Sequence, residues 1–171
     1  MISVDHIRLM ARYNQWQNCS IYDAAATLSD AQRRENRGAF FGSIHGTLSH
    51  LMWGDRMWMS RFAGLEKPAV NIPGSADLYP DWEELKAERV RFDDVIVDWA
   101  DGLEQDWTVG DLTWFSGATG REMTRPRWFL LTHFFNHQTH HRGQVHAMLT
   151  AAGAKPDDTD LMLMDPTTLG R

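Results

Sequence analysis

The segment 130–152, LLTHFFNHQTHHRGQVHAMLTAA, decides the fold prediction. It contains no proline and one glycine, and an α-helix turns by about 100° per residue, so residues three or four apart share a face. One face of this helix collects a continuous apolar seam interrupted by two histidines: Leu130, Phe134, His137, His141, Val145, Met148 and Ala152. Such a seam is typical of a helix packed inside a bundle.

Three other segments have the same helical character. The four long helices are expected at about 3–28, 43–64, 81–103 and 126–152. Ser3, Ser43 and Thr124 stand where side chains can cap helix N-termini, and Gly153 supplies a C-terminal stop. Close packing of helices is the expected reason for Gly143 inside the last helix.

The connections between these helices differ in length and character. Residues 64–80 include three prolines and are too long for a tight turn, which indicates a crossover. Residues 108–123 have two short segments around SGATG at 116–120, which predicts a small hairpin. The tail 155–171 is expected to be loop. The predicted fold is an all-α four-helix bundle in one domain over residues 1–171, with a long crossover between helices two and three and this hairpin between helices three and four.

Composition excludes several classes of function. Lys and Arg number 17 against 23 Asp and Glu, for a net charge of −6, so binding to nucleic acid is not expected. The apolar runs are far shorter than a membrane span, and the N-terminus does not resemble a signal peptide. The single cysteine, Cys19, excludes an internal disulfide framework and fits a cytoplasmic location.

The eight histidines are clustered, and five of them lie within 133–146. Only His137 and His141 belong to the apolar seam, whereas His133 and His140 lie roughly 80–100° away from it. Two buried imidazoles need polar partners. One metal ion could serve both, because residues four apart on a helix can bind one ion together. The alternative is a pair of core histidines bonded to carbonyls or other side chains, and the spacing leaves both interpretations open.

Helix two offers a third ligand, either His45 or His50. His45 falls among polar residues of that helix, whereas His50 lies on the flank of its apolar arc and is the better inward candidate. Asp55 sits among apolar residues, where a buried ion pair or a bond to a neighbouring helix is favoured over a direct metal role. Asn14 and Gln17 are polar on the seam of helix one, and hydrogen bonds inside the bundle are favoured over pocket lining.

Several known catalytic patterns are absent. Gln138 follows His137, so the HExxH motif of zinc proteases is missing, and no Glu stands three residues before a histidine as in di-iron bundles. Cys19 points away from the seam of helix one, which argues against a thiol nucleophile in the same pocket. His140 is expected on the helix surface, with an outer-shell base as its other interpretation. Arg142 is expected to face solvent or a dimer partner, with an anion clamp as its other interpretation.

Three stretches together resemble the DinB/YfiT-like superfamily of metal-dependent enzymes. They are NHQTHHRGQ at 136–144, SIHGTLSH at 43–50 followed by Trp58, and YNQW at 13–16. The first is the more specific, and the resemblance extends over most of the chain. It implies a four-helix bundle with a crossover, a homodimer, and a divalent metal held by His50, His137 and His141.

The resemblance also implies activities such as thiol-dependent transfer or isomerisation with mycothiol or bacillithiol. Three neutral imidazoles leave the charge of an ion unneutralised and leave coordination positions open, so bound water or a thiol would become acidic. We therefore expect a hydrolase, or a thiol-dependent transferase or isomerase, acting on a small molecule with zinc or nickel, or else iron. The alternatives are a non-catalytic metal- or ligand-binding bundle, such as a sensor or stress protein, and a bundle whose histidines are structural.

Overall fold

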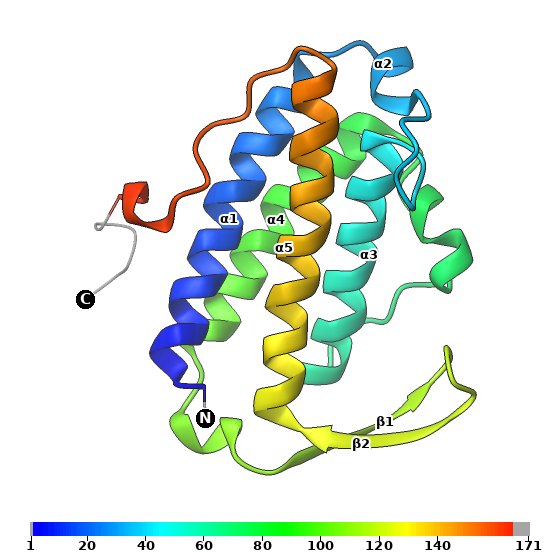
Figure 1. The fold of residues 1–171 in the computed structure, drawn as a ribbon. Helices are drawn as coiled ribbons and strands as arrows, with labels where there is room; N and C mark the ends of the chain where they lie inside the picture. Colours follow the sequence, from blue (N-terminus) through cyan, green and yellow to red (C-terminus); the bar gives the residue numbers. More distant parts are fainter. Residues whose placement is uncertain (1, 166–171) are drawn as a thin grey trace.

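The computed structural model describes residues 2–165, most of which are helical (Figure 1). Its elements in chain order are α1 (Val4–Ala26), α2 (Asp30–Arg34), α3 (Ile44–Phe62), η1 (Ile72–Asp77), α4 (Trp82–Asp101), η2 (Gln105–Thr108), β1 (Asp111–Ser116), β2 (Arg121–Pro126), α5 (Arg127–Ala151) and η3 (Leu161–Leu163). The long helices α1, α3, α4 and α5 correspond to the four predicted helices. Within the described residues, no helix is long and apolar enough to cross a membrane.

Side-chain caps set the start of three long helices. Ser3 accepts a hydrogen bond from the backbone N–H of His6, and Ser43 accepts one from Gly46. The carboxylate of Asp81 does the same for the N–H of Glu84. These bonds satisfy backbone donors that the first helical turn leaves without partners. The predicted caps at Ser3 and Ser43 are therefore confirmed.

The predicted cap at Thr124 is wrong. Thr124 lies in β2, where it pairs with Thr113 of β1, and the two hydroxyl oxygens are 2.8 Å apart. Helix α5 begins at Arg127 without any side-chain cap. The predicted hairpin itself is confirmed: β1 and β2 pair antiparallel from Asp111–Pro126 to Ser116–Arg121. Figure 1 shows the hairpin extending away from the base of α5.

The core lies between the long helices. Helix α1 packs against α4 and α5, and α3 packs against α5 and α4 (Figure 1). Completely buried side chains come from all four of these helices, among them Ile7, Ile21, Leu48, Leu85, Ile96, Phe134 and Leu149. Because α5 contacts helices on two sides, its buried arc is wider than the predicted seam. Gln138 and Arg142 are therefore buried as well.

The burial of Arg142 corrects the surface position expected for it. Its guanidinium lies over the ring of Tyr13 on α1, 5.6 Å from the ring centroid, and burial lowers the pKa of Arg142 to about 10. Gly143 is the opposite case. A Cβ at this position would meet no atom within 4 Å, so the expectation of close helix packing there is wrong.

A buried polar network ties the long helices together. Arg89 of α4 forms ion pairs of 2.7 Å with Asp55 of α3 and 2.7 Å with Asp93 of its own helix. Gln138 of α5 donates to Asp55 over 2.9 Å, and Asn14 of α1 donates to Gln138. The ion pair predicted for Asp55 and the internal hydrogen bond predicted for Asn14 are both confirmed.

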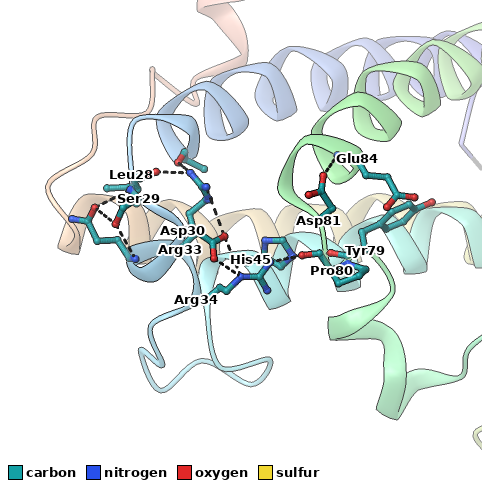
Figure 2. Close-up of polar contacts among 12 residues, drawn as sticks. Leu28, Ser29, Asp30, Arg33, Arg34, His45, Tyr79, Pro80, Asp81 and Glu84 are labelled. Atoms are coloured by element: carbon teal, nitrogen blue, oxygen red, sulfur yellow. Dashed lines mark hydrogen bonds and ion pairs between the residues drawn. The ribbon is translucent and has the colours of Figure 1, made fainter.

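The short helix α2 is not evident from the sequence pattern. Ser29 and Gln32 form a capping box at its start, and Arg34 binds Asp30 and the carbonyl of Pro80 (Figure 2). Beside this contact, Nε2 of His45 lies 2.7 Å from the carbonyl of Tyr79. His45 belongs to the face of α3 that is expected to be polar. The connection that contains Tyr79, before α4, covers His45 and buries it.

The chain after α5 runs back along α1 (Figure 1). Gln17 donates to the carbonyl of Asp158 over 2.9 Å, and the hydroxyl of Tyr13 donates to the carbonyl of Thr159 over 2.7 Å. The predicted loop is confirmed for most of the described tail, with the short η3 at Leu161–Leu163 as the exception. The prediction for residues 166–171 lies outside the described residues. Cys19 is exposed, as expected.

Candidate metal centre

His50 of α3 meets His137 and His141 of α5. One ring nitrogen from each can be chosen so that all three atoms lie within 4.8 Å of one another. The Nε2 atoms of His50 and His137 are 3.2 Å apart. Imidazole nitrogens bound to zinc at about 2.0–2.1 Å in tetrahedral geometry are about 3.3 Å apart. The spacing of this first pair therefore fits two ligands of one ion.

Gly54 lets α5 approach α3 at this point. It lies one helical turn after His50, and a Cβ added there would be 2.8 Å from Cε1 of His137. Any side chain at position 54 would push the ring of His137 away. The glycine is thus part of the geometry that brings the histidines together, although it sits in a helix where glycine costs about 1 kcal/mol relative to alanine.

Hydrogen bonds orient two of the rings. Nδ1 of His50 lies 2.8 Å from Oγ of Ser75, whose own proton is donated to the carbonyl of Ile72. Oγ must therefore accept from Nδ1–H, which leaves Nε2 of His50 with a free lone pair. Nδ1 of His141 likewise donates to Oε1 of Gln144 over 2.7 Å. Such partners fix the tautomer and orientation of metal-binding histidines.

His137 has no comparable partner. Its Nδ1 is buried and makes no hydrogen bond within the described part of the chain. Its Nε2 faces Nε2 of His50, and only one proton can lie between two such nitrogens. A buried imidazole with an unsatisfied nitrogen is costly. A cation between the two Nε2 atoms would replace that single proton and bind both lone pairs, so these two nitrogens fit a bound metal, and Nδ1 of His137 would then carry its ring proton.

Burial keeps the three imidazoles in their neutral form. It lowers the pKa of His50 to about 3, with the neighbouring charge of His141 as a second cause. It also lowers the pKa of His137 to about 3, with the other histidines as further causes. The pKa of His141 is lowered chiefly by burial, although its hydrogen bond to Gln144 opposes the shift. Neutral imidazole is the form that binds metal ions.

Aromatic rings enclose His50. Phe41, in the connection between α2 and α3, stacks on it with the ring centroids 3.6 Å apart, and also lies 5.4 Å from His141. Trp53 stacks on His50 at 5.6 Å. These contacts restrict the access of water to the cluster from the side of Phe41.

A cavity of about 750 Å³ opens beside the cluster. His50 and His137 are among the residues that line it, and its walls come from α3, from residues 67–73, from the hairpin and from α5. His133 and Trp58 stand on the wall with their ring centroids 5.1 Å apart, and the ring of His133 is 5.9 Å from that of His137. Partial burial and the charge of Arg61 lower the pKa of His133.

The three predicted histidines lie together in the structure, but the helical spacing does not point to the residues around them. His140 is on the surface and does not line the cavity, as expected. His133 lies off the predicted seam, but its spacing of four from His137 is a signal that the two rings lie close together. Phe41 and Ser75 come from connections whose path the helical periodicity does not describe.

Two comparisons with known proteins extend these observations. Protein DinB of Bacillus subtilis (strain 168) is 27% identical over 152 residues, which cover 86% of this chain and 87% of the relative. The sequence profile described as the DinB family matches residues 2–168. Since that match extends over nearly the whole chain, the chain belongs to the DinB family.

Proposed function

We propose that the chain binds one divalent metal ion through His50, His137 and His141. We further propose that it acts as a metal-dependent hydrolase, or as a thiol-dependent transferase or isomerase, on a small molecule. The observation that supports this most is the convergence of three neutral histidine nitrogens within 4.8 Å of one another, from two buried residues and the half-buried His137, beside a cavity. Zinc or nickel suits imidazole ligands, as does iron.

The donor set favours chemistry over a purely structural site. Structural zinc sites are closed by a fourth protein ligand, whereas no fourth histidine, cysteine or carboxylate joins the group among residues 2–165. An ion held by three neutral imidazoles lowers the pKa of a coordinated water or thiol towards neutrality. The protein would contribute orientation through Ser75 and Gln144, and exclusion of water through Phe41.

The finer features of the fold and assembly belong to the same proposal. The pairwise packing of α1, α3, α4 and α5 supports a four-helix bundle, in which residues 63–81 form the crossover from α3 to α4. We also propose a cytoplasmic homodimer, which sedimentation of the purified protein at several concentrations would test. A monomer at all concentrations would contradict this part of the proposal.

Metal content is the first test. Protein purified without an affinity tag is stripped with a chelator and titrated with Zn²⁺ or Ni²⁺ by calorimetry. We expect one ion per chain for the wild type and at least a hundredfold weaker binding for His137→Ala. His146→Ala is the matched control, because it removes a histidine of the same helix outside the cluster. Equal binding by the wild type and His137→Ala would refute the proposed site.

Activity is the second test. The metal-loaded protein is screened against model esters and amides, and for conjugation of mycothiol or bacillithiol to electrophiles. We expect turnover by the wild type and by His146→Ala, and none by His137→Ala. A protein that binds the ion with full occupancy but turns over none of these compounds would fit a non-catalytic metal-binding bundle instead.

A further inference from the structure

Arg61 lies in the wall of the cavity beside the histidine cluster without a counter-ion. Its guanidinium carbon lies 4.5 Å from the ring centroid of Trp58 and 5.5 Å from that of Trp114. Arg56 on the same helix is different, because it contacts Glu88 and the hydroxyl of Tyr79. Among the ion pairs formed by residues 2–165, none includes Arg61.

The lining of the cavity makes this cation unusual. Lys67 lines it together with Arg61, and no described residue of the lining is Asp or Glu. Partial burial lowers the pKa of Arg61, and no acidic neighbour opposes this effect. A partly desolvated cation without a counter-ion is costly. A small anion entering the cavity would supply the missing charge.

Arg61 comes from α3 two helical turns after the position that contacts the histidine cluster. Gly54, which touches His137, and Arg61 are seven residues apart on α3. Residues at that separation share a helix face and are about 10 Å apart along the axis. The lining also carries apolar and aromatic side chains, namely Trp53, Met57, Trp58 and Trp114.

We propose that the cavity binds a small molecule with an anionic head group, a carboxylate or a phosphate, held by Arg61. An apolar or aromatic body would lie along the tryptophans and direct its other end to the histidine cluster. The planar guanidinium suits both head groups, because its N–H groups can bind two oxygens at once. As an assignment of substrate class this inference rests on the proposed function, whereas the anion site itself does not require the metal.

Calorimetry with four probes of similar shape tests whether the cavity prefers an anionic head group. The probes are 4-phenylbutyrate, 4-phenylbutyl phosphate, 4-phenylbutanol and 4-phenylbutylamine, each titrated into metal-free and Zn²⁺-loaded protein. We expect one or both anions to bind at least tenfold more tightly than the alcohol, and the amine to bind most weakly. The two anions show which head group fits better.

Arg61→Met keeps the apolar stem and removes the charge. We expect it to abolish the preference for the anions while Zn²⁺ binding is retained. Arg91→Met is the control, because Arg91 is exposed, binds Glu88 and does not line the cavity. If Arg61→Met does not fold, the same preference in the wild type must decline between about 20 mM and 0.5 M NaCl, as expected for a charge that is partly open to solvent.

The outcomes separate this inference from the proposed function. Equal binding of all four probes would overturn the inference, and so would an anion preference that Arg61→Met leaves unchanged. If that variant does not fold, an anion preference that does not decline with added salt would overturn it. A preference that survives in Arg61→Met but disappears without Zn²⁺ would place the anion on the metal and would also overturn it. A preference that depends on Arg61 in a protein without any metal binding would leave the anion site standing and refute the proposed function.

Discussion

Replacing Gly54 by alanine would place a methyl carbon 2.8 Å from Cε1 of His137. Two carbon atoms in ordinary contact are about 3.5–4.0 Å apart, so the ring would have to retreat by roughly 0.7–1.2 Å. The 3.2 Å separation between Nε2 of His50 and Nε2 of His137 would then widen to a similar extent. Ligands of one tetrahedral zinc ion need a separation of about 3.3 Å, so Gly54→Ala should impair metal binding.

We expect Zn²⁺ affinity to fall by about 10- to 100-fold in Gly54→Ala, as for other changes that displace a ligand without removing it. Stability of the metal-free protein should change less. Alanine gains about 1 kcal/mol of helix propensity, and crowding of the ring costs about 1–3 kcal/mol. The net effect is a loss of about 0–2 kcal/mol, within reach of urea unfolding.

Gly143→Ala is the matched control. It is the same substitution in the middle of α5, where a Cβ would meet no atom within 4 Å. We expect it to stabilise the protein by up to about 1 kcal/mol and to leave Zn²⁺ affinity unchanged. Calorimetric titration of the three proteins decides the matter. Wild-type affinity in Gly54→Ala, or an equal loss in Gly143→Ala, would refute the argument.

Three further predictions concern other contacts. Ser75→Ala removes the acceptor of Nδ1–H of His50 and should weaken Zn²⁺ binding about tenfold in calorimetry, and unchanged affinity would rule out this orienting role. Asp55→Ala removes the carboxylate that pairs with the buried Arg89 and should lower the free energy of unfolding by about 3–5 kcal/mol in urea titrations. A loss below about 1 kcal/mol would contradict this expectation. His137 has a pKa of about 3 in the folded protein against 6.5 as its ordinary value, so metal-free protein should lose stability as pH falls below about 6.5, because unfolding takes up a proton. The loss of unfolding free energy that this group causes at pH 5 should be about 1–2 kcal/mol. Urea unfolding of His137→Gln should therefore depend less on pH than that of the wild type. An equal pH dependence in both proteins would refute this.

The helical periodicity was sufficient to select His137 and His141 from five neighbouring histidines. It succeeded because α5 packs against other helices along its whole length, so that burial follows the turn of the helix. The same argument was weaker for His50, which lies on the flank of an apolar arc. For His50 the resemblance to a family contributed more than the geometry of one helix. The structure brings His50 together with His137 and His141.

Two of the errors share one physical cause, which is that a pattern along one helix does not show what covers its other faces. Arg142 and His45 lie off the predicted seams but are buried, the first facing Tyr13 of α1 and the second beneath the carbonyl of Tyr79. Phe41 and Ser75 reach the cluster from connecting segments. Their positions depend on turns and caps that a search for helical spacing does not follow.

The polar network accounts for the alignment of α3 with α5 at the cluster. Gln138 follows His137 in the chain and donates to Asp55 of α3, while His137 itself faces His50 of α3. Asp55 is fixed in turn by Arg89, so sliding α5 along α3 would break a buried, charge-assisted hydrogen bond. Such a bond is costly to leave unmade in the interior. The network therefore opposes sliding of the two helices out of the register in which the three histidines meet.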